Sequence, residues 1–458
     1  MTSKKPLIHL IGIGGIGVSG LARWFLAHNW AISGSDLAST GITQELIKDG
    51  VKVKIGHKKA NLPPGTRLVI FSQAVRPSNP ELREARRRGI FILSYSQMLG
   101  RLTRMYKTIA IAGTHGKSTT TGFVSTILTR AGLDPTVIIG TKLRILGNRN
   151  FRNGKSDYLI LEADEYKGAF WNYSPTLAAI TNIDREHLDF YKNLKNVKGA
   201  FLKFIKNVRR GGELVLNADD PNLRSLKGQI DNIAKTNLIR VHWISIKNKN
   251  KYALRVKKHI NLPGEHNLSN ALAAFTLGKL LGISENKILA GISSYHGAWR
   301  RMEYRGTYHL PHTTYYLPVY DDYAHHPTEI RATLKAFKEK YPTRKLICVF
   351  QPHHTERLKN LFKDFLTAFD DADTTLILPV YKVAGRENEK SAVTSEMLVK
   401  AIRHREPHKP IFYLANPKNL RNAITTLLSA KSYKLKAVVV MMGAGDIANY
   451  TEFLILGR

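Results

Sequence analysis

The stretch AIAGTHGKSTTTGF, residues 110–123, decides the fold of the central part of the chain. An apolar run typical of a buried strand enters a glycine loop that ends in Gly116, Lys117 and Ser118, and a helical pattern follows. The N–H groups of such a loop, its lysine and its hydroxyl suit the phosphates and the magnesium ion of ATP. Ile111 stands where the full Walker pattern has its first glycine, but these chemical groups are all retained. The predicted ATP-binding residues of this loop are Gly113, Thr114, His115, Gly116, Lys117, Ser118 and Thr119.

A second glycine loop, GIGGIG at residues 12–17, lies between a predicted strand and a predicted helix. It fits the pattern G-x-G-x-x-G, and Asp36 stands about 20 residues further on, as in nicotinamide dinucleotide sites. Backbone N–H groups at a helix start bind any diphosphate, so a nucleotide-sugar diphosphate fits this loop equally well. The predicted binding residues here are Gly12, Gly14, Gly15, Gly17, Ser35 and Asp36.

Length and composition indicate a multidomain protein of the cytoplasm. The chain has 458 residues, enough for roughly three domains of about 150 residues each. Its single cysteine, Cys348, lies in an apolar run and excludes a disulfide framework, which favours a reducing compartment. No run approaches the roughly 18 apolar residues of a membrane span, and no secretory signal is evident. We expect a cytoplasmic protein without membrane insertion.

The charge balance is strongly basic, with 70 Lys+Arg against 35 Asp+Glu and a net charge of +35. The basic residues are spread along the whole chain, and no basic tail, zinc spacing or nucleic-acid motif accompanies them. We therefore predict no specific nucleic-acid partner. The positive field still favours anionic substrates.

Apolar strand-like runs alternate with helical stretches in three blocks, which predicts α/β domains with parallel sheets. We place the domains at residues 1–106, 107–305 and 306–458. In the central block, acidic residues follow two of the runs, as EADE at 162–165 and TNIDREHLDFY at 181–191. Glu165 is the better candidate for a magnesium ligand, because Mg²⁺ prefers carboxylate oxygen. For His187, a metal ligand and a hydrogen-bonding histidine are both open.

In their order along residues 8–447, the motifs of this chain resemble those of the Mur ligase family, and those of the third block favour its alanine-adding members. The motifs are GTHGKSTT, EADE, TNIDREHLDFY, NADD, PGEHNLSNALAA, GAWRRMEYRG, DDYAHHPTEI and FQPHHTER. The resemblance implies three α/β domains: a Rossmann-like first domain, a central P-loop ATPase-like domain with a mixed sheet, and a Rossmann-like third domain.

The resemblance also implies a reaction in peptidoglycan precursor synthesis. The first loop would hold the diphosphate of UDP-N-acetylmuramate and the second would hold ATP. The muramoyl carboxylate would attack the γ-phosphate, and L-alanine would displace phosphate from the acyl phosphate. Mg²⁺ is the implied cofactor beside ATP, and a monomer or homodimer is expected.

Residue by residue, the resemblance assigns these roles to motif positions. Lys117 would bridge the β- and γ-phosphates, with Ser118 and Glu165 on one Mg²⁺ and Glu165 with His187 on another. The implied ATP contacts outside the loop are Asn270, Arg301 and Asp322. The residues implied to receive alanine are Tyr323, His325, His353 and Arg357, of which His325 and Arg357 join Lys117 as catalytic candidates.

The sequence departs from the family pattern at three places. Tyr166 and Lys167 replace the usual serine and aspartate after Glu165, and His354 stands where an arginine is usual. The third departure concerns the carbamylated lysine of several Mur ligases, for which only Lys198 and Lys203 lie near the expected place. A ligase that attaches a tripeptide to the same sugar nucleotide is the alternative function. A nicotinamide oxidoreductase and a nucleic-acid-dependent ATPase each explain only one of the two glycine loops.

Overall fold

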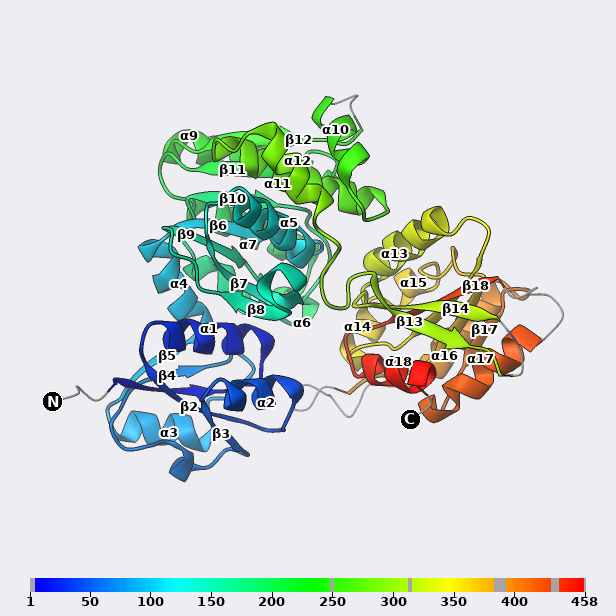
Figure 1. Ribbon diagram of the computed structural model, residues 1–458, viewed down its shortest axis with the longest axis horizontal. Coiled ribbons are helices and arrows are strands. Elements are labelled where there is room, and N and C mark those ends of the chain that lie inside the picture. The colour runs from blue at the N-terminus through cyan, green and yellow to red at the C-terminus, as the bar shows by residue number, and fades with distance from the viewer. Residues whose placement is uncertain (1–4, 248–250, 312–314, 383–392, 430–435, 457–458) are drawn as a thin grey trace. The chain divides into compact units, whose positions relative to one another are not determined.

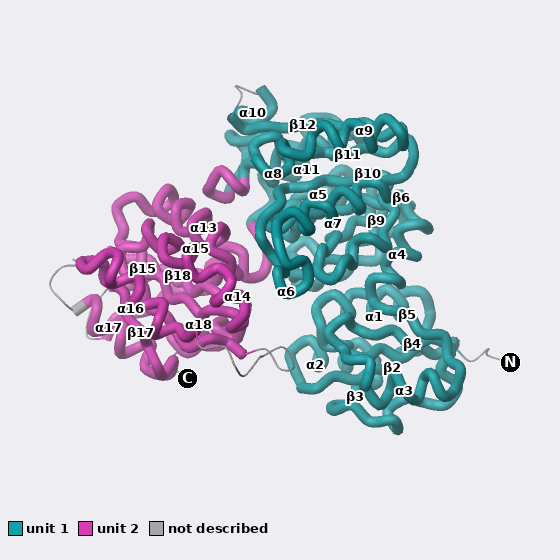
Figure 2. Tube along the Cα trace, turned by 180° about the vertical axis from the view of Figure 1, so that it is seen from behind, with its two compact units in different colours: residues 1–261, 268–296 teal, residues 262–267, 297–458 magenta. Residues whose placement is uncertain are grey.

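Three β-sheets organise the computed structural model, which describes residues 5–247, 251–311, 315–382, 393–429 and 436–456 (Figure 1). The chain forms two compact units: residues 1–261 with 268–296, and residues 262–267 with 297–458 (Figure 2). The first unit holds the first two sheets, and the second unit holds the third sheet. The three-domain α/β class predicted from the sequence is confirmed, whereas the domain limits stay a prediction. In the described ranges, no helix has the length and apolar character needed to cross a bilayer.

The first sheet is parallel throughout, with the order β3-β2-β1-β4-β5. Its strands are β1 (Leu7–Ile11), β2 (Ala31–Asp36), β3 (Lys52–Ile55), β4 (Thr66–Phe71) and β5 (Phe91–Ser94), and its helices are α1 (Ile16–Ala27), α2 (Gly41–Lys48), α3 (Pro80–Arg87) and α4 (Tyr95–Met105), with the 3₁₀ turn η1 (Lys59–Asn61). Ile8 and Leu10 pack on the α1 face, and Ile11 packs on the α3 face. The strand order reverses between β1 and β4, and such switch points are where doubly wound sheets bind ligands.

The central sheet is mixed, as expected, with the order β12-β11-β10-β6-β9-β7-β8 and β8 antiparallel to β7. Its strands are β6 (Lys107–Ala112), β7 (Thr136–Leu143), β8 (Arg149–Arg152), β9 (Tyr158–Glu162), β10 (Leu177–Ile180), β11 (Glu213–Asn217) and β12 (Arg240–Ile244). The helices that accompany it are α5 (Lys117–Arg130), η2 (Arg144–Leu146), η3 (Tyr166–Asn172), α6 (Leu188–Tyr191), α7 (Leu194–Lys206), α8 (Pro221–Arg224), α9 (Lys227–Asn237), α10 (Lys251–His259), α11 (Glu265–Leu280) and α12 (Glu285–Ser293). Helix α5, which follows the second glycine loop, is buried from Ser118 to Leu128.

The third sheet has the order β13-β14-β18-β15-β16-β17, in which only β13 is antiparallel to its neighbour. Its strands are β13 (Glu303–His309), β14 (Tyr316–Asp322), β15 (Lys345–Phe350), β16 (Thr374–Ile377), β17 (Ile411–Tyr413) and β18 (Ala437–Met442). Its helices are α13 (Pro327–Lys340), α14 (Thr355–Asn360), α15 (Phe362–Phe365), α16 (Ser395–Arg405), η4 (Pro417–Asn419), α17 (Leu420–Ser429) and α18 (Ile447–Leu456). Cys348 is buried in β15, as expected.

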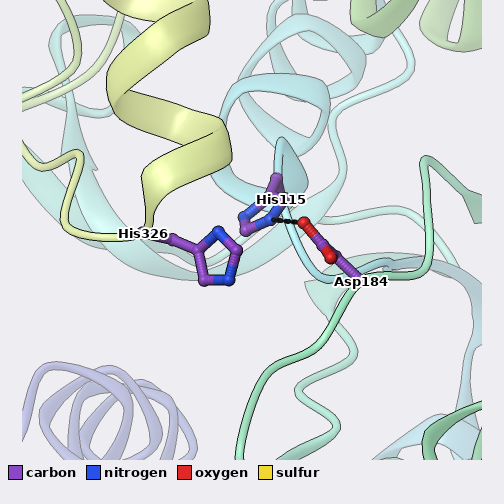
Figure 3. Close-up of side chains that lie close together, drawn as sticks. All are labelled: His115, Asp184 and His326. Carbon is purple, nitrogen blue, oxygen red and sulfur yellow. Dashed lines mark hydrogen bonds and ion pairs between the residues drawn. The ribbon is translucent and has the colours of Figure 1, made fainter. Parts of the chain in front are cut away.

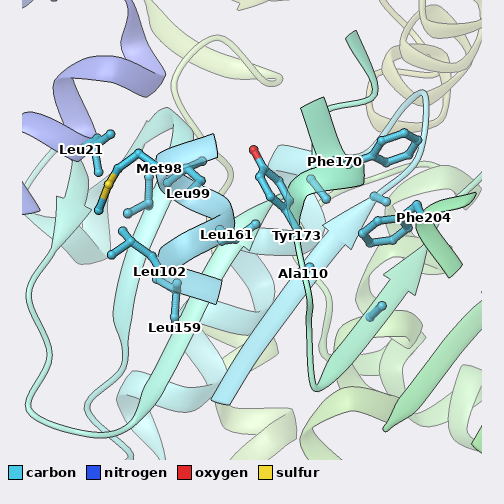
Figure 4. Packing of buried hydrophobic residues seen from close by; sticks show 14 of the residues in the cluster. Leu21, Met98, Leu99, Leu102, Ala110, Leu159, Leu161, Phe170, Tyr173 and Phe204 are labelled. Carbon is cyan, nitrogen blue, oxygen red and sulfur yellow. The ribbon is translucent and has the colours of Figure 1, made fainter. Parts of the chain in front are cut away.

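Helix α4 joins the first two sheets through a shared apolar core (Figure 4). Leu99 and Leu102 of α4 belong to the same buried cluster as Leu159 and Leu161 of β9, and Leu21 of α1 completes it. Full burial of a leucine side chain contributes roughly 1.5–3 kcal/mol. The shared core therefore fixes the helix that follows the first glycine loop against the central sheet.

A polar network between α1, α2 and β8 strengthens this junction. Arg23, only 4% exposed, donates to Asp49, to Glu45 and to Asn150 of β8. Asn150 in turn donates to the backbone oxygen of Ile16 at the start of α1. One buried guanidinium thus links α1, α2 and the antiparallel edge of the central sheet.

We expect Arg23→Ala to lower the free energy of unfolding of the first unit by about 1–3 kcal/mol, because the buried Asn150 oxygen loses its donor, whereas Glu45 and Asp49 keep Lys142 and Arg149 as partners. Urea denaturation followed by fluorescence measures this change. Arg87→Ala is the control, since Arg87 pairs with Glu84 on the exposed surface of α3 and contributes little there. An equally small effect at both arginines would show that the network does not hold the junction.

Candidate functional site

The first glycine loop is held by backbone and carboxylate hydrogen bonds from the end of β2. Gly12 adopts a φ of +78° and donates its N–H to the oxygen of Ser35 at 2.8 Å. Gly14 donates its N–H to Asp36 Oδ2, also at 2.8 Å. Helix α1 begins after Gly15, and no side chain of the described residues caps its N-terminus. The first-turn N–H groups of α1 are therefore oriented as an anion site requires.

Gly14 and Gly17 each lie close to a neighbouring side chain. A Cβ added to Gly14 would lie 2.9 Å from Asp36 Oδ2, and a Cβ added to Gly17 would lie 2.7 Å from the hydroxyl oxygen of Tyr95. The glycines are thus required by close approach as well as by backbone freedom. Asp36, predicted as a ligand contact, also shapes the loop itself.

A buried carboxylate that the sequence analysis missed supports Ser35 from below. Glu81 of α3 is fully buried and accepts hydrogen bonds from Ser35 Oγ at 2.6 Å and Asn61 Nδ2 at 3.1 Å, and it contacts His9 Nε2 at 2.7 Å. Burial alone would raise the pKa of Glu81, but the hydrogen bonds of His9 and Ser35 outweigh it and lower the pKa. No local motif marks Glu81, because its partners come from three separate segments.

In the second glycine loop, the side chain of Lys117 folds back toward the loop and toward the segment that follows β9. Gly116 precedes α5 with a φ of +84°, and Gly113 has a φ of +133°. Lys117 Nζ donates to the backbone oxygens of Gly113 and Thr114 at 2.6 and 3.1 Å and to Glu165 Oε2 at 2.8 Å. Burial alone would lower the pKa of Lys117, but the carboxylates around it, Glu165 foremost, raise the pKa, so the ammonium stays charged.

The segment after β10 braces the same loop from its other side. His115 donates its backbone N–H to Asn182 Oδ1 at 2.9 Å, and Thr114 Oγ1 accepts from the backbone N–H of Asp184 at 2.9 Å. His115 Nε2 lies 3.1 Å from Asp184 Oδ2, and Figure 3 shows the two side chains joined. The TNIDREHLDFY motif therefore has a structural role at the loop.

Three further predicted residues of the ATP site lie at the start of α5 or against it. Ser118 and Thr119 are buried in the first turn of the helix. Asn270 of α11 is so close that a Cβ on Gly116 would lie 2.5 Å from its Oδ1. The structure thus brings Asn270 to the loop although more than 150 residues separate them.

Potential metal ligands gather at the end of β9. Donor atoms of Asp164, Glu165 and His187 lie within 4.8 Å of one another. Glu165 is 1% exposed, and its Oε1 has no hydrogen-bond partner among the described residues, although His187 Nε2 lies 3.8 Å away. A buried carboxylate oxygen without a donor suits a cation. Asp164 is an addition to the residues chosen from the sequence, where its place in EADE was the available signal.

The residues that depart from the family pattern also have defined positions here. The Tyr166 ring lies 4.9 Å from the His187 ring, and Lys167 adopts a φ of +49°. Lys198 donates to Ser225 Oγ, and Lys203 packs over the Trp171 ring at 4.1 Å. The contacts of Lys198 and Lys203 thus do not place either of them beside Glu165.

In the second unit, the four residues predicted to receive alanine form one cluster at the ends of β14 and β15. The Tyr323 and His325 rings are 5.4 Å apart, and the His325 and His353 rings are 5.8 Å apart. Arg357 of α14 completes the cluster, with NH1 3.1 Å from His353 Nδ1. The sequence reasoning missed Tyr381, whose ring stacks on His353 at 5.6 Å.

The hydrogen bonds fix the protonation sites of the two histidines. His325 Nδ1 lies 2.9 Å from the backbone oxygen of Tyr323, which can only accept, so in the neutral ring Nδ1 carries the proton and Nε2 has the lone pair. Arginine can only donate, so His353 Nδ1 accepts from Arg357 and the His353 ring is neutral. His325 Nε2 is therefore the better positioned base.

His354 has a structural role in this arrangement. Its Nδ1 accepts the backbone N–H of Glu356 at 3.2 Å, so the imidazole caps α14 and holds Arg357 in the following turn. An imidazole that accepts at Nδ1 and donates at Nε2 is neutral. His354 thus does not replace the charge of the arginine usual at this position.

Arg301 and Asp322, the predicted ATP contacts of the second unit, lie beside this cluster. Arg301 stacks over the Tyr323 ring at 5.0 Å and lies 3.8 Å from Glu329. Asp322 is buried and accepts from the backbone of Met302 and Ala324, and burial raises the pKa of Asp322.

Models of the Mur ligase family match three successive parts of the chain. The model described as the catalytic domain of the Mur ligase family matches residues 7–107. The Mur ligase middle domain matches residues 111–278, and the glutamate ligase domain of Mur ligases matches residues 300–445.

Curated relatives and solved structures agree with these matches. The UDP-N-acetylmuramate–L-alanine ligase of Clostridium botulinum strain Langeland is 39% identical, over 99% of this chain and 98% of the relative. The enzyme of the same name from Aquifex aeolicus is 39% identical, over 86% and 87%. The crystal structure of the UDP-N-acetylmuramate-alanine ligase of Thermotoga maritima has a TM-score of 0.77 at 27% identity, with 98% of each chain covered. A murein peptide ligase from Psychrobacter arcticus, with a TM-score of 0.68 at 22% identity, shares the fold. The chain belongs to the Mur ligase family.

Proposed function

We propose that the protein joins L-alanine to the carboxylate of UDP-N-acetylmuramate with cleavage of ATP to ADP and phosphate, in peptidoglycan precursor synthesis. Membership of the family makes it an ATP-dependent ligase. The single observation that carries the specific reaction is the pair of glycine loops in one unit, one at the switch point of the first sheet and one bearing Lys117. Two nucleotide substrates require two such loops. We place the reaction in the cytoplasm, where ATP is available, and expect a monomer or homodimer.

The proposed first step takes place at the second loop. A carboxylate oxygen of the muramoyl group forms a bond to the γ-phosphorus, and the bond from that phosphorus to the bridging oxygen of ADP breaks. Lys117 binds the β- and γ-phosphates and offsets their charge, and its contacts with Gly113 and Thr114 hold it in place beforehand. We infer that Asn270 contacts the adenine, and its position against Gly116 supports this role.

The residues around Glu165 fit a magnesium ion. The Glu165 Oε1 atom and the Asp164 carboxylate are hard oxygen donors, and Ser118 supplies a hydroxyl at the start of α5. We propose that Ser118 and Glu165 hold Mg²⁺, and that His187 with Glu165 serves a second ion. When bound, Mg²⁺ neutralises phosphate charge.

The second step uses the cluster in the second unit. The alanine nitrogen forms a bond to the carbonyl carbon of the acyl phosphate, and the bond to the phosphate oxygen breaks. His325 Nε2 takes the proton of the alanine ammonium, since its lone pair is fixed by the bond from Nδ1 to Tyr323. Arg357 binds the alanine carboxylate through its guanidinium, and His353 orients that arginine.

The product formed from UDP-N-acetylmuramate, ATP and Mg²⁺ tests the proposed function directly. With L-alanine and the tripeptide L-Ala-γ-D-Glu-diaminopimelate in competition, we expect mass spectrometry to find the alanine adduct. Lys117→Ala is expected to reduce turnover by about 100-fold or more, because a preorganised charge on the transferring phosphoryl group is lost. Binding of UDP-N-acetylmuramate should be unchanged in that variant. A predominant tripeptide adduct would overturn the choice of acceptor, and near-normal turnover of Lys117→Ala would overturn the ATP-loop assignment.

The magnesium assignment is tested by ADP binding with and without Mg²⁺, measured by calorimetry. We expect Glu165→Gln to lose most of the increase in ADP affinity that Mg²⁺ causes, because an amide offers a neutral and weaker ligand. Asp189→Asn is the control, since Asp189 is an exposed acid of the same segment. If Glu165→Gln kept the full magnesium effect, another residue would hold the ion.

The role of Arg357 is tested by steady-state kinetics with varied L-alanine. Arg357→Lys should raise the KM for alanine by about tenfold or more, because an ammonium cannot form the paired hydrogen bonds of a guanidinium. The KM for ATP should change little. Lys359→Gln, an exposed change on the same helix, serves as the control. An unaltered KM for alanine in Arg357→Lys would remove Arg357 from the acceptor site.

A further inference from the structure

Lys167 has an unusual conformation and position. Its φ of +49° and ψ of +30° place it in the left-handed region, which residues with a side chain rarely adopt, and Gly168 follows with a φ of +69°. The side chain is exposed. Lys167 Nζ lies 3.5 Å from the backbone oxygen of Gln73 and 5.3 Å from the Tyr166 ring centroid. Among the described residues, no carboxylate forms an ion pair with it.

The ammonium of Lys167 lies between the segments that carry the two nucleotide loops. Gln73 follows Ser72, and a Cβ on Gly12 of the first loop would lie only 2.9 Å from Ser72 Cβ. Along its own segment, Lys167 is two residues from Glu165. The backbone of Lys167 therefore lies in the segment of Glu165, whereas its ammonium reaches the segment beside the first glycine loop.

The contact that Lys167 makes is held in place by its surroundings. Ser96, buried at the start of α4, accepts hydrogen bonds from Gln73 Nε2 at 3.0 Å and from Asn172 Nδ2 at 3.3 Å. Asn172 is the last residue of η3, the turn that contains Lys167. The two segments on either side of the lysine are thus tied to one serine.

The charges nearby make a cation necessary for an incoming carboxylate. Asp164 and Glu165 precede Lys167, and Tyr95, whose hydroxyl lies against Gly17, has its pKa raised by burial and by the charges of Glu162 and Asp164. Lys117 is already bonded to Glu165 and to two backbone oxygens. A second carboxylate entering here meets repulsion, which the proposed Mg²⁺ ions and the ammonium of Lys167 would both offset.

We propose that Lys167 binds the muramoyl carboxylate of UDP-N-acetylmuramate and positions it for attack on the γ-phosphate. This inference rests on the proposed function of the two loops. The lysine selects the acid from other UDP-sugars, because its ammonium interacts with the one group that distinguishes them. The diphosphate is bound separately, by the N–H groups at the start of α1.

Calorimetric binding of two ligands to the full-length protein tests the proposal. UDP-N-acetylmuramate carries the carboxylate, whereas UDP-N-acetylglucosamine shares the rest of the molecule without the lactyl group. Lys167→Asn removes the charge, and asparagine tolerates the left-handed backbone, so the fold is retained. We expect the variant to bind UDP-N-acetylmuramate about tenfold or more weakly, as for loss of a charge-assisted hydrogen bond, and UDP-N-acetylglucosamine within about twofold of the original affinity. Lys167→Arg should keep most of the selectivity.

Lys192→Asn provides a matched control. Lys192 is also an exposed lysine with a positive φ, +70°, and it also donates to a backbone oxygen, that of Asp189. Its substitution should alter neither affinity. Equal weakening of both ligands by Lys167→Asn would assign the lysine to the diphosphate or to loop stability, and no weakening would remove it from the site. Either result overturns the proposal. If the unaltered protein selects the acid through Lys167 but forms no alanine adduct, the proposed function fails and the carboxylate site stands.

Discussion

The buried ion pair between Lys117 and Glu165 is the interaction on which the catalytic part of the structure depends. Its atoms are 2.8 Å apart, with the two side chains 16% and 1% exposed. Removal of one partner from such a pair costs about 3–5 kcal/mol, because the other charge is left buried. The same ammonium holds two backbone oxygens of the glycine loop. One charge pair thus fixes the loop, the start of α5 and the segment after β9, with its candidate metal ligands, relative to one another.

Parallel strand order explains why distant motifs converge around this pair. Strands β10, β6 and β9 are neighbours, so the segments that follow them, with Asn182, Gly113 and Glu165, emerge at one edge of the sheet. The third sheet repeats the arrangement: β18 lies between β14 and β15, which carry the alanine cluster. The loop after β18 is held there by Arg300, which donates to the oxygens of Gly443 and Gly445. In both units, the candidate functional residues therefore lie in segments that follow the ends of neighbouring strands.

The sequence was sufficient for the elements with a strong local signal. Both glycine loops and the strands that enter them were predicted from apolar runs and glycine spacing. The edge strands β3, β8, β12 and β13 were not predicted, because their half-exposed residues carry charges and give no clear apolar run. The interior strand β7 was not predicted either, although most of its residues are buried. The Glu81 network, the approach of Asn270 to Gly116 and the stacking of Tyr381 on His353 depend on tertiary packing between distant segments. The helix-capping role of His354 follows from its positive φ, which no residue pattern revealed.

The distribution of residues between the two units has a consequence for catalysis. Both glycine loops, Lys117, Glu165, Asn270 and Lys167 belong to the first unit, whereas the proposed alanine-binding residues all belong to the second. In the first unit, α4 and Arg23 join the two sheets through a shared core and a buried network. On the proposed assignment, the sugar nucleotide and ATP bind to loops that folding has already ordered against each other. Much of the entropic cost of bringing two anionic substrates together is thereby met before they bind. In the proposed acceptor site, selection of the amino acid would rest on local groups of the second unit, chiefly Arg357 and the two histidines beside it.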